Sequence, residues 1–236
     1  MTIFFSCMLL CLTACEDDTT EYENRDVKVQ IETGKNWLHD FPVMLGIKKK
    51  NPPQIAIWVE DTAGRYISTI YVSHKVSSQD WVAANGNRRK EALPHWCHKR
   101  GVQYDDGLYM PIKDEPVADA LTGATPHSSS DVRMHPKTLP AQFVVKAEIN
   151  HSIDWNNTYP KDAAEDADNY SGGSEGSGQP AIVYAVTVDA RSGKKSFTAD
   201  LIGHSSPDGS DGKLYPDTDA LTSAQHIVKQ ITVSIR

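Results

Sequence analysis

The body of this sequence has almost no cysteine. Of four cysteines in 236 residues, Cys7, Cys11 and Cys15 all lie near the N-terminus, and only Cys97 lies in the remainder of the chain. A disulfide within that remainder is therefore excluded. Stability must come from burial of apolar side chains, which form 39% of the residues and are enough for one core.

The chain also lacks an excess of positive charge. Its 24 Lys and Arg residues stand against 31 Asp and Glu residues, and the formal net charge of −7 argues against a nucleic-acid-binding surface. Five of the acids lie in residues 16–23, so residues 24–236 are nearly neutral, with 26 acids and 24 bases. A long apolar segment is missing too, because the run at residues 3–14 is shorter than the roughly 20 residues of a membrane-spanning helix.

The N-terminal run ends in Leu12-Thr13-Ala14-Cys15, which resembles the lipobox of bacterial lipoproteins. The resemblance implies a signal peptide at 1–14, a lipid on Cys15, and a position on the periplasmic or cell-surface side of a bacterial membrane. The alternative is an ordinary secretory signal with a chance cysteine, and no Lys or Arg precedes the apolar run. Residues 15–26 are predicted to be an acidic disordered tether. Their acidic run resembles the surface-export signal of Bacteroidetes lipoproteins, or is simply a solvated spacer.

Alternating apolar residues and strong β-formers predict about seven strands in the body of the chain. A hairpin is expected at 54–60 and 66–72, and a second one pairs 181–189 with 196–202. The predicted fold is therefore all-β, an immunoglobulin-like antiparallel β-sandwich with long loops and a few short helices. We expect one domain at 27–236 with an irregular insertion at 74–140. Within it, Pro94 and Gly101 predict a short helix between them.

That helix carries His95, Trp96, Cys97 and His98, a density that suggests a metal site. On a helix His95 and His98 share a face while Cys97 points away, so a site would need a distant ligand such as His204. The alternative, which this geometry favours, is that Trp96 and Cys97 pack inward and the histidines bond loop backbone. No complete catalytic constellation is present, so the sequence does not predict an enzyme.

Residues 119–126 read Asp-Ala-Leu-Thr-Gly-Ala-Thr-Pro. This combination of small and polar residues is more specific than a connection between strands requires. They resemble the flavinylation motif of extracytoplasmic FMN-binding proteins. The resemblance implies that a flavin transferase joins the phosphate of FMN to the hydroxyl of Thr125. It implies a cofactor-binding loop made of Asp119, Thr122, Gly123, Ala124 and Thr125. The alternative is a structural turn in which Asp119 binds backbone amides and Gly123 supplies a positive φ.

Four segments, at 53–61, 66–72, 91–98 and 119–126, are together similar to the DUF 2271 family of predicted periplasmic proteins of unknown function. The resemblance covers about residues 53–150. It implies an extracytoplasmic β-rich domain that accompanies flavin-transfer and membrane redox proteins.

Two functions follow as expectations. The first is an accessory redox or electron-transfer protein that carries FMN on Thr125, with His95, Trp96 and His98 beside the flavin and a flavin transferase or membrane redox protein as partner. The second is a non-catalytic module that binds a glycan or a protein. Its stacking platforms would be exposed side chains of Trp37, Trp81 and Trp155; the alternative, favoured for each of the three, is that the side chain packs in the core.

Overall fold

The structure is a computed structural model that describes residues 26–42, 47–79, 81, 88–115, 117, 120–134 and 139–236. The predicted signal peptide, the lipidation site Cys15, all but the last residue of the predicted tether, and the motif residue Asp119 lie outside these ranges. No helix in the described ranges has the length and hydrophobicity that a membrane span requires.

Most of the regular structure in the described residues is β-strand. In chain order the elements are β1 (Val27–Thr33), β2 (His39–Pro42), β3 (Lys48–Asn51), β4 (Gln54–Glu60), β5 (Tyr66–Ser73), α1 (His74–Ser78), α2 (Pro94–Arg100), β6 (Leu121–Gly123), β7 (Ser130–Met134), β8 (Gln142–Asn150), the 3-10 helix η1 (Gly173–Glu175), β9 (Ile182–Asp189), β10 (Ser196–Thr198), β11 (Asp200–His204), the 3-10 helix η2 (Ala224–His226) and β12 (Val228–Ile235).

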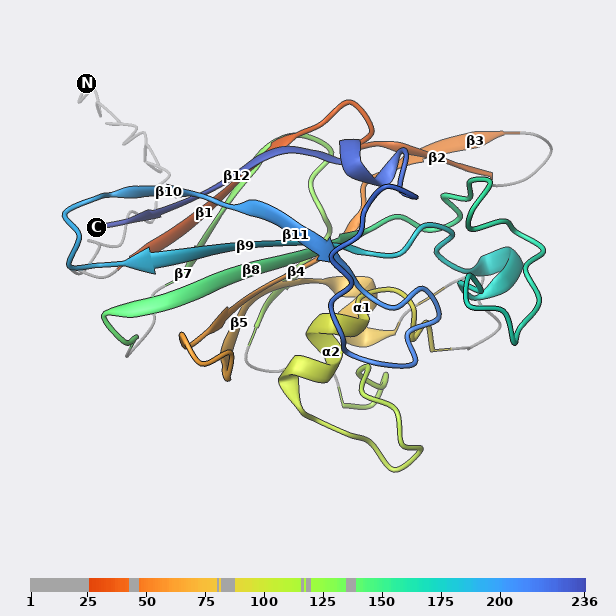
Figure 1. Cartoon of the computed structure of the whole chain (residues 1–236), viewed down its shortest axis with the longest axis horizontal. Helices are drawn as coiled ribbons and strands as arrows, with labels where there is room; N and C mark the ends of the chain where they lie inside the picture. The colour runs from red at the N-terminus through yellow and green to blue at the C-terminus, as the bar shows by residue number, and fades with distance from the viewer. Residues whose placement is uncertain are drawn as a thin grey trace, which may run out of the picture.

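These strands form two main sheets and a separate two-stranded ribbon. One sheet has the order β10-β12-β1-β7, the other has the order β11-β9-β8-β4-β5-β6, and β2 pairs with β3. Neighbouring strands are antiparallel, except that β6 runs parallel to β5. Figure 1 shows the β1, β10 and β12 layer above the β4, β5, β8 and β9 layer. The predicted all-β antiparallel sandwich is confirmed.

The main core fills the space between the two sheets. Val29 of β1 and Val233 of β12 are fully buried in one cluster with Ile57 of β4 and Val145 of β8. Strand β1 buries every second residue, as expected for a strand with one face on a core and the other near solvent. Strand β4 is buried on both faces, so a second layer must cover the outer face of its sheet.

Helix α2 provides part of that second layer. Its Trp96 and Cys97 lie in a second buried cluster with Trp58 of β4 and Val72 of β5. The helix begins at Pro94 and ends before Gly101, whose φ of +71° completes the predicted asymmetry. Figure 1 shows both helices on the side of the large sheet that faces away from the small one.

Two expectations about the strands differ from the structure. Strand β9 pairs with β11, whereas β10, expected as its hairpin partner, pairs with β12 of the opposite sheet. The chain changes sheets at Ala199, whose N–H bonds Ile231 of β12. The 74–140 segment also contains regular structure beyond short helices, because β6 extends one sheet and β7 the other. Its low apolar content concealed these short edge strands.

Candidate functional site

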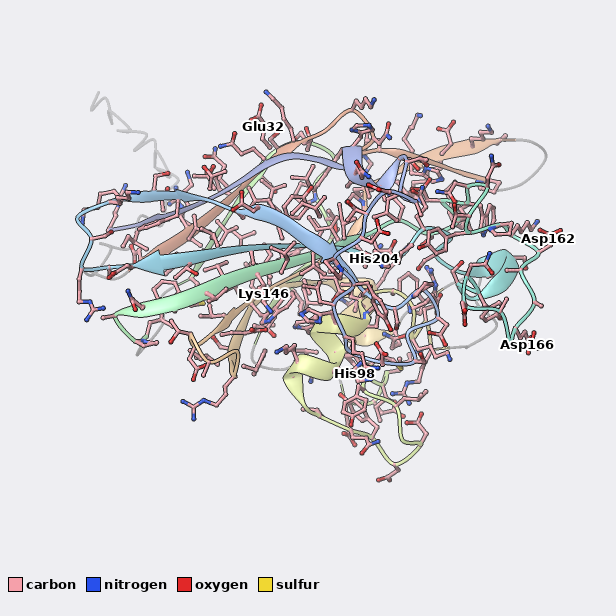
Figure 2. The ribbon with its side chains drawn as sticks, viewed as in Figure 1. Glu32, His98, Lys146, Asp162, Asp166 and His204 are labelled. Carbon is pink, nitrogen blue, oxygen red and sulfur yellow. The ribbon has the colours of Figure 1, made fainter. Side chains whose placement is uncertain are left out.

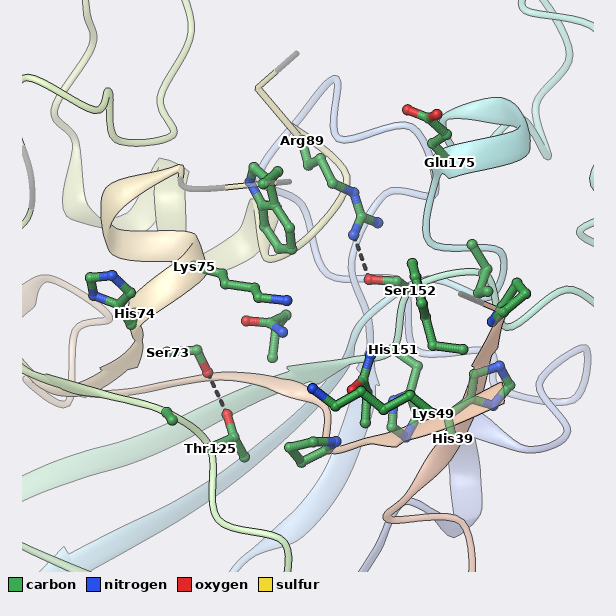
Figure 3. Close-up of a pocket in the computed structure, with 18 of the residues that line it drawn as sticks. His39, Lys49, Ser73, His74, Lys75, Arg89, Thr125, His151, Ser152 and Glu175 are labelled. Carbon is green, nitrogen blue, oxygen red and sulfur yellow. Dashed lines mark hydrogen bonds between the residues drawn. The ribbon is translucent and has the colours of Figure 1, made fainter. Parts of the chain in front are cut away.

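A cavity of about 570 Å³ lies beside the β2–β3 ribbon and helix α1. Its size is within the range of pockets that hold small organic ligands. Figure 3 shows its walls, with Thr125 on one side and Arg89 and Glu175 on the other. The lining residues are His39, Phe41, Pro42, Lys49, Asn51, Pro52, Gln54, Ser73, His74, Lys75, Trp81, Arg89, Gly123, Ala124, Thr125, His127, His151, Ser152, Ile153, Trp155, Lys161, Ser174 and Glu175.

The predicted motif loop forms one wall of this cavity. Gly123, Ala124 and Thr125 line it, whereas Thr122, which is exposed on β6, does not. Strand β6 reaches this position because it pairs in parallel with the end of β5, with Gly123 beside Ser73. The structure therefore brings three of the motif residues to a pocket formed by segments distant in sequence.

The loop is held in place by three hydrogen bonds. The side chains of Thr125 and Ser73 lie 2.8 Å apart at their hydroxyl oxygens. The hydroxyl of Tyr71 donates to the carbonyl of Gly123 at 3.0 Å, and burial raises the pKa of that hydroxyl. The indole N–H of Trp37 donates to the carbonyl of Pro126 at 2.9 Å. Thr125 is only 7% exposed, so it lines the cavity as part of a fixed, largely buried wall.

Helix α2 lies elsewhere, and none of His95, Trp96 and His98 lines the cavity. The backbone N–H groups of His95 and Trp96 donate to the carboxylate of Glu148, at 3.1 and 2.7 Å. The Trp96 indole N–H donates to the Thr69 hydroxyl at 3.0 Å. The expected placement of these three residues beside a flavin on Thr125 is therefore not what the structure shows. The bonds of His95 and Trp96 fix α2 against the sheet.

The ring nitrogens of the two helix histidines also have structural partners. The Nδ1–H of His95 donates to Gly212 at 2.7 Å, and burial lowers the pKa of His95 to about 4. The Nδ1–H of His98 donates to Pro94 at 2.9 Å, and its ring stacks on Tyr109. Figure 2 shows His98 on α2 and His204 at the end of β11. Among the residues described, no three His, Cys, Asp or Glu side chains are arranged to hold a metal ion.

The three tryptophans proposed as stacking platforms separate into two groups. Trp37 is 3% exposed and belongs to the main core, so it offers no face to a ligand. Trp81 and Trp155 are half-buried and line the cavity. The Arg89 guanidinium lies 4.8 Å from the centre of the Trp81 ring, and the Lys161 ammonium lies 5.5 Å from that of Trp155. Both contacts are cation–π interactions.

Positive charge dominates the cavity wall, a feature that the sequence reading missed. Lys49, Lys75, Arg89 and Lys161 line it, against Glu175 as the one acidic residue among the described lining residues. The available signal was two basic runs, at 48–50 and 88–90, in a body of nearly balanced charge. The sequence does not show that these two runs come together at one cavity, because that depends on how the β2–β3 ribbon lies relative to the large sheet.

His151 forms part of the cavity floor in a defined tautomer. Its Nε2–H donates to the carbonyl of Asn36 at 2.9 Å, so the neutral ring keeps Nδ1 as an acceptor. Burial is the main reason that the pKa of His151 is lowered to about 4, with a smaller contribution from nearby His39. The ring is therefore uncharged at neutral pH, and it adds a polar acceptor to a wall that is otherwise cationic.

Comparisons with protein-family models, curated proteins and solved structures found no match to this chain. The arguments for a function therefore come from the cavity and the sequence motifs.

Proposed function

We propose that this protein is a lipid-anchored extracytoplasmic protein that carries FMN on Thr125 and serves in electron transfer. The observation that carries the proposal is the position of Thr125 in the wall of a 570 Å³ cavity lined by aromatic and cationic side chains. The motif was recognised from sequence alone, and nothing in the motif itself requires such a cavity. A loop acting only as a turn needs no ligand-sized space beside its threonine.

The chemistry of the cavity suits both parts of FMN. The ammonium groups of Lys49 and Lys75 complement a phosphate at Thr125, and Trp81 and Trp155 provide apolar surface for a planar ring. The flavin supplies the redox chemistry when bound. The protein binds it, orients it and shields it from water.

Attachment itself is a phosphoryl transfer that requires a transferase and a flavin dinucleotide. The Thr125 oxygen forms a bond to the phosphorus of the FMN half, the pyrophosphate bond breaks, AMP leaves, and the hydroxyl proton is lost to base. In the structure this oxygen is hydrogen-bonded to Ser73 and largely buried. Transfer therefore requires the segment around Thr125 to move away from the wall, or to be modified before the wall forms.

The membrane anchor rests on the sequence alone. Residues 12–15 match the pattern of a lipoprotein signal, and a lipid on Cys15 holds a domain at a membrane without a span. A flavin carried at a membrane surface suits a membrane redox protein as electron donor or acceptor. These partners are part of the proposal.

The decisive experiment is intact mass spectrometry after co-expression with a flavin transferase. Wild type is expected to gain the mass of one FMN and a yellow colour, and Thr125→Ala is expected to gain neither. Thr62→Ala is the control, because Thr62 is an exposed threonine that lies outside the motif. A wild-type protein that stays unmodified and colourless under these conditions refutes the proposal.

A second candidate is a non-catalytic binding module for a glycan, and one observation favours it. Trp81 and Trp155 stand in the walls of the same cavity, where aromatic rings can stack on sugar rings. This function needs no modification of Thr125. Saturable binding of a glycan by unmodified protein, lost in Trp155→Ala, would support it over the flavin carrier.

A further inference from the structure

Arg89 is the cationic side chain of the cavity wall that is held most firmly in position. It is 7% exposed, its Nε donates to the Glu91 carboxylate at 2.9 Å, and its two terminal nitrogens donate to the hydroxyls of Ser152 and Ser177 at 2.5 and 3.1 Å. A guanidinium has five N–H donors, and these bonds use three of them. One N–H on each terminal nitrogen of Arg89 therefore remains for a ligand, and the side chain, already held in place, loses little entropy on binding one.

Two lysines approach the cavity from other elements. Lys49 lies on β3 between Lys48 and Lys50, which both pair with Asp40. Because successive strand residues point to opposite faces, Lys49 faces the cavity instead. Lys75 comes from α1, and Figure 3 shows the two lysine side chains extending into the cavity from opposite walls. Within the described part of the chain, neither ammonium group is paired with a carboxylate.

Much of the charge of this wall is therefore uncompensated. Arg89 is paired with Glu91, but Lys49, Lys75 and Lys161 face one carboxylate among the described lining residues, that of Glu175. Cations gathered around a concave site attract a ligand of opposite sign more strongly than the same cations spread over an open surface. Holding them together without a ligand costs free energy through mutual repulsion, and an anion relieves that cost.

We propose that this cavity is a reversible binding site for a phosphate monoester of a ring compound, with the phosphate held by Arg89, Lys49 and Lys75. A phosphate monoester carries close to two negative charges at neutral pH, which suits a wall with an excess of two unpaired positive charges better than a single carboxylate does. Its oxygens accept the remaining N–H groups of Arg89 and lie beside the ammonium groups of the lysines. The ring of the ligand lies toward Trp81 and Trp155.

This binding does not require a covalent bond to Thr125, so a failure of flavin attachment would not contradict it. The binding is measured by titration calorimetry at low salt, on the full chain produced without a flavin transferase. Two probe pairs separate the ligand sources: FMN against riboflavin, and glucose 6-phosphate against glucose. We expect the phosphorylated member of at least one pair to bind at least about tenfold more tightly than its partner, and the pair that shows this identifies a flavin or a sugar phosphate.

The variants test which residues hold the phosphate. The double variant Lys49→Met, Lys75→Met is expected to weaken the phosphorylated probe about tenfold and leave the unphosphorylated one unchanged. Lys48→Met, from the same strand but the other face, is expected to change neither. Arg89→Lys keeps a buried positive charge beside Glu91 but removes the two remaining guanidinium N–H donors, and is expected to weaken the phosphorylated probe as well. If neither phosphorylated probe outbinds its partner, or the double variant loses no more than Lys48→Met, the assignment is overturned.

Discussion

The hydroxyl oxygen of Thr125 lies 2.8 Å from the hydroxyl oxygen of Ser73, the last residue of β5. The Ser73 oxygen also accepts the backbone N–H of Ile55 on the neighbouring strand β4, at 2.8 Å. One side chain thus connects the cavity wall to a central pair of strands in the large sheet. The position of the Thr125 hydroxyl is set by the sandwich core rather than by a free loop.

Replacing Ser73 by Ala is expected to destabilise the protein. The change removes the bond to Thr125 and leaves the N–H of Ile55, a residue that is 2% exposed, without its acceptor. A buried donor left unpaired costs about 1–3 kcal/mol of unfolding free energy, which urea denaturation measures. Ser210→Ala, at an exposed position in a loop, is the control and is expected to change it by less than about 0.5 kcal/mol. Equal effects of the two changes would contradict the role of Ser73.

The buried thiol of Cys97 is expected to be unreactive in the folded protein. Cys97 is 1% exposed, and burial, with a smaller contribution from Glu148, raises the pKa of its thiol. Since the thiolate is the reactive form, both access and ionisation are suppressed. In a chain with Cys7, Cys11 and Cys15 replaced by Ser, a thiol reagent at pH 8 should label nothing in buffer and one thiol in guanidinium. Rapid labelling of the native chain would show that α2 does not stay packed against the large sheet.

Stability is expected to fall in mild acid partly because of His151. Burial lowers the pKa of His151 to about 4, below its ordinary value of 6.5, so between these values the unfolded chain binds a proton that the folded chain does not. The unfolding free energy therefore falls as pH drops from 6.5 toward 4, by at most about 1.4 kcal/mol per pH unit from this group. His95, also with a pKa of about 4, adds a second contribution of the same sign.

A variant isolates the His151 contribution. His151→Gln keeps a donor for the carbonyl of Asn36 but does not titrate, so urea denaturation between pH 4.5 and 7.5 should show a shallower acid slope. The exposed His226 provides a control, and His226→Gln should keep the wild-type slope. Glu148 has the opposite sign, because burial raises its pKa to about 8 and its contribution falls as pH rises. Glu148 is present in wild type and in both variants, so its contribution cancels when their acid slopes are compared.

The parts of the fold that the sequence revealed are those governed by local pattern. Alternation defined β1 and β12, strong β-formers around Gly64 defined the β4–β5 hairpin, and Pro94 with Gly101 defined α2. Each signal lies within a dozen residues and expresses burial on one face or a backbone constraint. The 119–126 motif has a different basis, because it rests on a resemblance to a known attachment motif.

The cavity depends on contacts that no local pattern contains. Lys49, Lys75 and Arg89 come from a ribbon, a helix and a loop, and their convergence follows from how those elements meet. The pairing of β10 with β12 was hidden for a similar reason, since the sequence at 196–204 is equally compatible with one hairpin arm or with two strands in different sheets. From the sequence alone, a buried hydroxyl such as that of Ser177 cannot be told from the hydroxyl of an ordinary loop residue. Its role follows from its hydrogen bonds with Asn150 and Arg89, which are distant in sequence.

The rate of FMN attachment is expected to rise when the Thr125 segment is held less firmly. Tyr71→Phe removes the hydroxyl that donates to Gly123 but keeps the buried ring, so the wall retains its packing and loses about 1 kcal/mol of restraint. If transfer requires the segment to leave the wall, this loss increases the open population about fivefold, and the rate of mass gain with transferase increases by the same factor. Tyr184→Phe, in the main core, is the control and should leave the rate unchanged. An unchanged rate in Tyr71→Phe would mean that transfer takes place before the wall forms, because only then does the Gly123 bond not resist it.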